Sequence, residues 1–426
     1  MISKFQKELQ TLVNDKIITQ DIAEHIDKYY ASKEDNKSGR LFTIFGVLGS
    51  LLIGMGIILI VAHNWDHFSR SIKTLFAFLP LLIGQSLVGY SVFKAKGKTW
   101  REASGTFLFF AVGACIALIS QIYNIPGDLS SYLLTWTLLC IPIIYLLRSQ
   151  AVAILCLVFA TYYACNCGYA FTTRGQTPWY YLLLFVLVLP HYIQLLKSKP
   201  QSNITSVFNW LFPLSLIIVL GAFTDRYGDL GYLMYILLFG LFYNIGKLPF
   251  FDSQLLRKNG YVIFGSLGTV FLLLITSFKW IWRELFVMQI GFATQEMYIA
   301  SILFLLAFSL LLYSYSRKWV RQFNLYRFVF IIFTLYYIIG FKNATIPTVL
   351  VNVLILALGI MAIKIGADKM HFGTLNYGLL IVAVLITCRF FDTNMSFVLR
   401  GSLFVTVGAG FFIANYLMFQ KQKKKT

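Results

Sequence analysis

Residues 42–62 read FTIFGVLGSLLIGMGIILIVA, twenty-one consecutive residues without a charged side chain. An α-helix rises about 1.5 Å per residue, and about 20 apolar residues cross the hydrocarbon core of a bilayer. The stretch therefore predicts a membrane-spanning helix. Thirteen further apolar stretches follow it, and we expect helices at 73–93, 103–121, 131–147, 150–169, 179–196, 207–224, 230–246, 260–279, 298–315, 326–341, 344–364, 372–389 and 395–418.

The composition agrees with an all-α polytopic membrane protein of about fourteen transmembrane helices. Of the 426 residues, 58% are hydrophobic and 12% are charged, whereas soluble domains carry about 25% charged residues. A soluble chain of this size has too little polar surface to cover so many apolar side chains. The net charge of +19 does not indicate nucleic-acid binding, because the basic residues lie between the apolar stretches.

The distribution of basic residues predicts the orientation of the chain. With both termini in the cytoplasm, 27 of the 36 Lys and Arg residues fall on the inner side and 9 on the outer side. Short cytoplasmic loops of membrane proteins carry such an excess. Counting the acidic residues too, +17 of the +19 lies on the inner side, next to anionic lipid headgroups. Residues 281–296 are too polar to cross, and with Trp280 and Trp282 they predict an interfacial helix.

We divide the chain into three parts. Residues 1–40 predict a cytoplasmic amphipathic helical hairpin, 41–420 a multi-helix membrane domain, and 421–426 a basic cytoplasmic tail. The hairpin is too short to bury a core alone, so we expect it to contact a cytoplasmic protein partner, a second copy or the membrane domain. The charged start indicates no cleavable signal peptide.

A weak internal similarity suggests two parallel repeats. Residues 44–50, IFGVLGS, resemble residues 263–269, IFGSLGT, which would give repeats at 41–196 and 260–420. Transporters are often built from such repeats. The alternative is chance similarity between two Gly-rich apolar helices.

Candidate binding residues lie in the predicted outer loops. We call them the outer patch: Asp66, Arg70, Gln121, Tyr123, Asp128, Arg389, Asp392 and Arg400. Arginine forks suit phosphate or carboxylate groups. The alternative is a set of salt bridges that hold the loops. His63 and His67 flank Asp66 at helical spacing, but a third strong ligand is missing, so no metal is expected.

Few catalytic signals appear elsewhere. The apolar stretches contain no relay of Asp, Glu and His, no phosphate-binding Gly-Lys loop and no GxSxG motif, so we assign no catalytic residue and expect no cofactor. Four polar residues fall inside helices, Gln85, Asn244, Asn352 and Asn376. We expect them to make interhelical hydrogen bonds rather than to contact a substrate.

Three runs of sequence resemble one bacterial membrane-protein family. Gly49 to Asp66 is similar to the opening helix and Asn-Trp-Asp turn of the family called domain of unknown function 2157. Arg101-Glu102-Ala103 leading to 117–123, and Leu146 to Ser149, resemble it too. The resemblance is best over residues 10–150, and 389–401 looks like the closing signature of related proteins. It implies a polytopic protein of the bacterial cytoplasmic membrane and supplies no reaction.

These observations favour a transporter or flippase-like protein for a lipid-linked or amphiphilic anionic substrate. One alternative is a polyprenyl-phosphate-dependent glycosyltransferase, in which Asp66 would be the outer carboxylate. Another is a non-catalytic scaffold or sensor whose hairpin recruits a partner. In each case membrane lipids are expected partners and nucleic acid is not.

Overall fold

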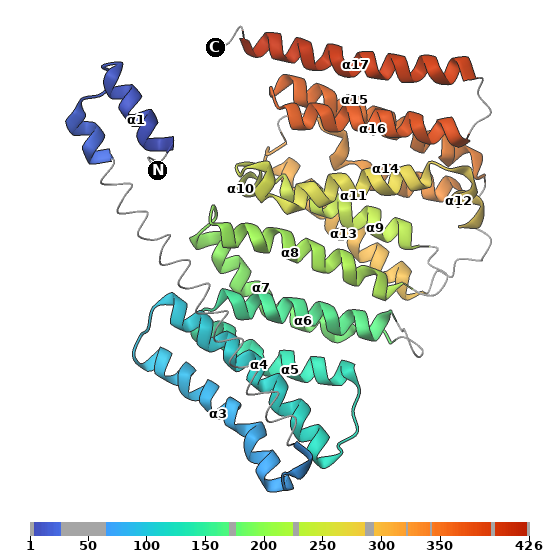
Figure 1. Ribbon diagram of the computed structural model, residues 1–426. Coiled ribbons are helices and arrows are strands. Elements are labelled where there is room, and N and C mark those ends of the chain that lie inside the picture. The colour runs from blue at the N-terminus through green and yellow to red at the C-terminus, as the bar shows by residue number, and fades with distance from the viewer. Residues whose placement is uncertain are drawn as a thin grey trace. The chain divides into compact units, whose positions relative to one another are not determined.

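The computed structural model describes residues 4–26, 65–169, 176–224, 230–285, 294–320, 323–340, 343–392 and 397–423. Within these ranges every regular element is a helix (Figure 1). The chain divides into two compact units, Met1–Ala77 and Phe78–Thr426. The predicted class is confirmed: the protein is an all-α polytopic membrane protein.

The first unit contains short helices. Helix α1 (Lys4–Asn14) is amphipathic, and after a turn residues 20–26 are helical again. The 3₁₀ helix η1 (Trp65–His67) precedes α3 (Arg70–Phe93), within which the boundary between the units falls. The predicted crossing at 42–62 lies outside the described residues. The same is true of the motif at 44–50, so the two repeats stay a prediction.

The second unit consists of long helices joined by short turns. They are α4 (Lys98–Tyr123), α5 (Leu129–Leu147), α6 (Gln150–Gly168), α7 (Trp179–Ser198), α8 (Asn203–Leu220), α9 (Gly231–Gly246), α11 (Gly260–Thr276), α13 (Gln295–Ser316), α14 (Val329–Gly340), α15 (Thr345–Asp368), α16 (Phe372–Asp392) and α17 (Phe397–Lys423). Shorter elements are η2 (Gly221–Phe223), α10 (Pro249–Asp252), η3 (Leu256–Lys258), α12 (Lys279–Glu284) and η4 (Leu325–Arg327).

The predicted helices from residue 73 onward all form, and their bounds differ from the prediction by at most five residues. Nine helices of the described chain are long and apolar enough to cross a membrane. Helices α9, α11 and α14 are shorter, and α14 has only 12 residues. At about 1.5 Å per residue α14 measures about 18 Å, less than the roughly 30 Å of a hydrocarbon core.

Helix α14 is shorter than the helix expected at 326–341. The Asn324 side chain accepts a hydrogen bond from Tyr326 N at 3.1 Å, which caps the 3₁₀ turn η4. The segment therefore begins as a tight turn that ends at Arg327, and the α-helix starts only at Val329. Arg327, which hydropathy assigns to the membrane helix, therefore lies in the 3₁₀ turn, and its charged side chain is buried inside the protein.

Glycines bring the central helices close together. Helix α9 packs against α11, α13 and α14. A Cβ atom on Gly265 of α11 would lie 2.6 Å from the backbone nitrogen of Tyr243 in α9, and one on Gly240 would lie 2.6 Å from the Cβ of Phe330 in α14. In α15 and α16, a Cβ on Gly378 would lie 2.6 Å from the Gly359 carbonyl oxygen. Small residues allow such close backbone approach between membrane helices.

The second unit has two ends that matter below. Helix α10 and the C-terminal end of the chain lie at the left in Figure 1, and α12 lies at the right. We call these the inner end and the outer end, after the predicted topology.

A correction concerns the predicted helix at 260–279 and the interfacial helix at 281–296. Helix α11 ends at Thr276, and α12 spans only Lys279–Glu284, while residues 286–293 lie outside the described chain. Trp280 is 53% exposed, but Trp282 is fully buried and donates its indole N–H to the Thr276 carbonyl at 2.6 Å. Trp282 is therefore a packing residue that caps α11 and not an interfacial anchor.

Candidate functional site

Two residues of the outer patch belong to the first unit. Asp66 lies in η1, Arg70 is the first residue of α3, and both are exposed. The neighbouring Lys73 ammonium lies 5.6 Å from the centre of the Trp65 ring. The remaining six candidates belong to the second unit, so a single patch of all eight residues stays a prediction.

Asp128 forms the N-cap of α5. Its carboxylate accepts a hydrogen bond from Ser131 N at 2.6 Å, and this bond lowers the pKa of Asp128 below its ordinary value. Gln121 and Tyr123 lie in the last turn of α4 and are exposed. The negative charge of Asp128 is thus used to cap a helix.

Arg389 lies where three helices of the second unit meet at the outer end. Its Nη2 donates to Ser277 Oγ at 3.1 Å, and its guanidinium lies 4.7 Å from the centre of the Phe278 ring. Asn352 of α15 donates to the Ser277 carbonyl at 3.0 Å. We call Ser277, Phe278, Asn352 and Arg389 the outer cluster.

The other predicted outer residues are less informative. Asp392 ends α16 and Arg400 lies in α17, but their side chains are outside the described part of the structure. His67 is exposed in η1, and His63 lies outside the described residues. Among the residues that the structure describes, no group of three His, Cys, Asp or Glu side chains is placed to hold a metal ion.

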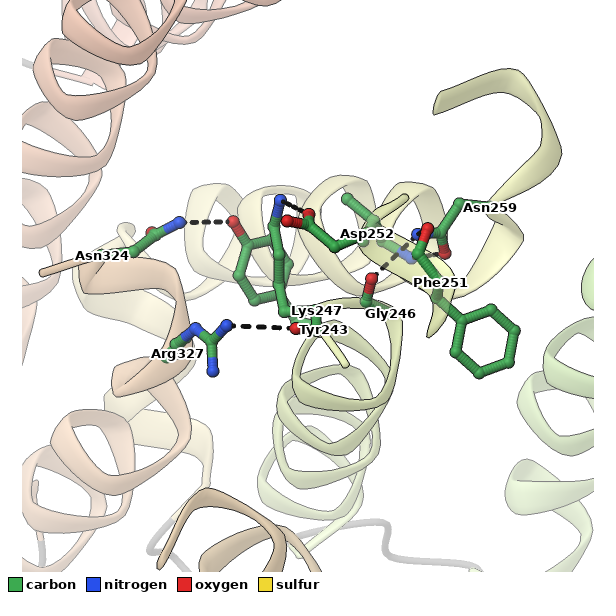
Figure 2. A network of polar contacts seen from close by, with 9 residues as sticks. Tyr243, Gly246, Lys247, Phe251, Asp252, Asn259, Asn324 and Arg327 are labelled. Carbon is green, nitrogen blue, oxygen red and sulfur yellow. Dashed lines mark hydrogen bonds and ion pairs between the residues drawn. The ribbon is translucent and has the colours of Figure 1, made fainter. Parts of the chain in front are cut away.

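A second cluster, at the inner end, centres on Arg327 and is absent from the predicted site. Arg327 is 6% exposed. Its Nη2 donates to the Lys247 carbonyl at 3.3 Å, while Nη1 is buried and makes no hydrogen bond within the described chain (Figure 2). Asn244 of α9 donates to the Arg327 carbonyl at 3.2 Å. A buried guanidinium with an unused N–H is costly.

Two stacked tyrosines belong to the same region of the structure. The Tyr243 ring stacks on the Tyr326 ring with centroids 5.3 Å apart, and its hydroxyl accepts a hydrogen bond from Asn324 Nδ2 at 2.8 Å. The Tyr326 hydroxyl lies beside that of Tyr377 in α16. We call Tyr243, Asn244, Lys247, Asn324, Tyr326 and Arg327 the inner cluster.

An ion pair closes the inner cluster toward the surface. Lys247 Nζ lies 2.8 Å from Asp252 Oδ1, and the two side chains are 20% and 48% exposed. Asn259 donates to the carbonyls of Gly246 and Phe251 at 2.8 and 3.1 Å, and so fixes the turn from α9 into α10 (Figure 2). This turn places Lys247 and Asp252 over the cluster.

The interhelical hydrogen bonds expected for the polar mid-helix residues are present at three of the four positions. Asn244 and Asn352 bond between helices as described, and Asn376 Oδ1 accepts from Asn415 Nδ2 of α17 at 2.9 Å. The importance of Arg327 was missed because in the sequence it is one of many basic residues beside an apolar stretch. Its position close to an asparagine and a tyrosine, in FNLYRFVF from 323 to 330, is the only local signal in the sequence.

Two of the sequence runs that carry the family resemblance meet in the structure. The Glu102 carboxylate accepts hydrogen bonds from Ser149 Oγ at 2.5 Å, Ala151 N at 2.9 Å and Gln150 N at 3.1 Å. Glu102 of α4 thereby satisfies free N–H groups at the start of α6.

Residues 10–153 match the family model described as "Predicted membrane protein (DUF2157)". The match confirms the resemblance expected for residues 10–150 and covers the contact between Glu102 and Ser149. It ends near the start of α6, so the inner and outer clusters both lie beyond the DUF2157 segment. No curated protein and no solved structure matches the chain.

Proposed function

We propose that this protein is a transporter or flippase-like protein that moves a lipid-linked or amphiphilic anionic substrate across the membrane. The observation that supports the proposal is the position of Arg389 at the interface of α11, α15 and α16. Charged side chains inside a membrane domain are expensive, and they commonly mark a substrate or ion pathway. A scaffold needs no such group between its helices.

Helices α11, α15 and α16 reach toward both clusters. The outer cluster contains Ser277, which directly follows α11, Asn352 of α15 and Arg389 of α16. Toward the inner cluster, the Leu358 carbonyl of α15 accepts from the Tyr326 hydroxyl, and Tyr377 of α16 contacts both Tyr326 and Ser266 of α11. Ser266 and Ser277 are eleven residues apart, which corresponds to about 17 Å along a helix. Two arginine sites near opposite ends of one helix group suit the passage of an anion.

The exposed outer residues Gln121 and Tyr123 lie in α4, which Figure 1 shows well apart from α16. The proposed anion contact at the outer end is therefore Arg389 alone. The glycosyltransferase alternative has less support, because it needs a shaped cleft around Asp66 and that carboxylate is exposed in a 3₁₀ turn.

The test is a lipid-movement assay with the full chain. Purified protein is reconstituted into vesicles of phosphatidylcholine and phosphatidic acid that contain a trace of fluorescent phosphatidic acid, and dithionite quenches the outer leaflet. We expect the protein to expose the inner-leaflet label, with fluorescent phosphatidylcholine moving more slowly. Arg389→Gln should slow the movement about tenfold, the effect of losing about 1.4 kcal/mol of charge-assisted bonding.

The matched control is Arg283→Gln, because Arg283 is an exposed arginine of α12 at the same end. It should move lipid as the unchanged protein does. Equal rates for protein-containing and empty vesicles with both lipids would contradict the flippase-like activity. Equal rates for Arg389→Gln and the unchanged protein would remove Arg389 from the pathway.

A further inference from the structure

We infer that the inner cluster is a binding site for a phosphate group, carried either by a lipid headgroup or by a small phosphate in the cytoplasm. The inference rests on the proposed function, in which the cluster would be the inner contact for the anionic substrate, and it names the chemical class that the site takes. The argument comes from the hydrogen-bonding groups that the cluster leaves unused.

The cluster contains an excess of hydrogen-bond donors. Arg327 Nη1 is buried without a partner. Tyr243 accepts from Asn324, and no described hydrogen bond uses the proton of its hydroxyl. Lys247 has three N–H bonds and one ion-pair partner, Asp252. Together these groups carry two positive charges and are paired with one carboxylate. The unused hydrogen-bond donors therefore suit an anion and not a cation.

One unused acceptor narrows the class of anion. Asn244 Oδ1 is buried without a hydrogen bond, although the Nδ2 of the same amide is bonded to the Arg327 carbonyl. A phosphate monoester near neutral pH is partly protonated, because its second pKa is about 6. It therefore offers acceptor oxygens to Arg327 and a P–OH donor to Asn244. Carboxylate and sulfate ions offer acceptors alone.

The Lys247–Asp252 ion pair is the entrance to this site. Both side chains of the pair are partly exposed, whereas Arg327 and Asn244 are buried. Because Arg327 Nη1 is closed off in this structure, the ion pair has to open before an anion reaches it. Asp252 is then a competing anion for Lys247, and it repels an incoming phosphate. Removal of the Asp252 charge should therefore tighten phosphate binding, an effect that a purely structural cluster would not show.

The experiment measures binding to the full chain in detergent micelles by isothermal titration calorimetry. One arm titrates inorganic phosphate, and the other titrates phosphatidic acid in mixed micelles. Sulfate, acetate and diacylglycerol are the controls for charge and for the acyl chains. We expect saturable binding in at least one phosphate arm. Binding of phosphatidic acid alone identifies a lipid headgroup as the source, and binding of inorganic phosphate identifies a small soluble ligand.

Three variants distinguish binding from folding. Arg327→Gln should weaken binding at least about tenfold, as expected for the loss of a charge-assisted contact. Arg257→Gln, an exposed arginine of η3 at the same end, should bind as the unchanged protein does. Asp252→Asn should bind phosphate several-fold more tightly, because it removes the competing carboxylate. If Arg327→Gln fails to fold, Tyr243→Phe, which keeps the stacked ring and loses only the hydroxyl, should weaken binding instead.

The inference is overturned if neither phosphate arm gives saturable binding, if sulfate or acetate binds as tightly as phosphate, or if Asp252→Asn binds no more tightly than the unchanged protein. Each of these results would leave Arg327 as a structural residue whose polar atoms are served by buried water. The outcome of the vesicle assay is independent of the outcome of the binding experiment. Phosphate binding without lipid movement would retain this site and reject the proposed transport.

Discussion

The carboxylate of Glu102 in α4 accepts a hydrogen bond from the hydroxyl of Ser149, the N-cap of α6, at 2.5 Å. The same carboxylate also accepts from the first two backbone N–H groups of α6. One acidic side chain therefore holds two helices of the DUF2157 segment together. It stabilises a helix N-terminus both by hydrogen bonding and by its charge.

Removal of this carboxylate should destabilise the membrane domain. Glu102→Ala leaves three donors at the start of α6 without their acceptor, and we expect a loss of about 2 kcal/mol in the free energy of unfolding. Thermal unfolding in detergent, followed by tryptophan fluorescence, measures it. Glu284→Ala changes an exposed carboxylate of α12 and serves as the control. An unchanged midpoint for Glu102→Ala would contradict the capping role.

The cap on α5 should make stability depend on pH in acid. Hydrogen bonding to Ser131 lowers the pKa of Asp128, so the folded state favours the ionised form. The cap therefore stabilises the protein fully above the ordinary value of 3.8, and this contribution falls as the pH drops through the lower folded value. We expect Asp128→Ala to cost about 1 kcal/mol at pH 7. The difference in unfolding midpoint between Asp128→Ala and the unchanged protein should shrink from pH 7 to pH 3. A difference that stays constant with pH would exclude the Asp128 carboxylate as the source of the stabilisation.

The close approach of α9 and α11 should tolerate no side chain at Gly265. A Cβ there would lie 2.6 Å from Tyr243 N and 2.8 Å from its Cα, and backbone atoms cannot swing aside. We expect Gly265→Ala to destabilise the protein by about 1 to 3 kcal/mol. Gly89→Ala in α3 meets no atom within 4 Å and should be neutral or slightly stabilising. Thermal midpoints of the two variants test the difference, and equal midpoints would refute the packing argument.

The two tryptophans of α12 should respond differently to the same change. Trp282→Phe keeps an aromatic ring but loses the 2.6 Å hydrogen bond to the Thr276 carbonyl, so we expect a cost of about 1 to 3 kcal/mol. Trp280→Phe alters a half-exposed ring and should stay within about 0.5 kcal/mol of the unchanged protein. Chemical unfolding of both variants measures this. A larger effect at Trp280 than at Trp282 would contradict the packing role of Trp282.

Hydropathy predicted the helices well because the signal is local. A run of apolar residues flanked by capping residues such as Ser149 or Asp128 defines a membrane helix whatever lies beside it. The same signal did not predict the burial of Trp282 and Arg327. In both places a buried N–H group donates a hydrogen bond to a backbone carbonyl elsewhere in the protein. The Trp282 indole donates to Thr276, and the Arg327 guanidinium donates to Lys247. Hydropathy averages along the chain and contains no information about such partners.

The candidate site also combines features that the sequence predicts with features that only the structure shows. The sequence marked Arg389 as an anion contact from its place at the end of a predicted helix, but it gave no reason to connect Arg389 with Ser277 or Asn352. It counted Arg327 only as one of the basic residues on the inner side. Their surroundings depend on which helices are neighbours, and glycines such as Gly265 and Gly378 allow those neighbours to approach closely.

The amino-acid sequence by itself determined that this protein is helical and lies in a membrane, because apolar length and composition are properties of the chain alone. It also carried the DUF2157 resemblance over its first third. Only the tertiary structure decided which polar groups are buried together. Arg327 meets Lys247 from 80 residues away and Arg389 meets Ser277 from 112 residues away. Contacts at such separations arise from helix packing, and no local pattern encodes them.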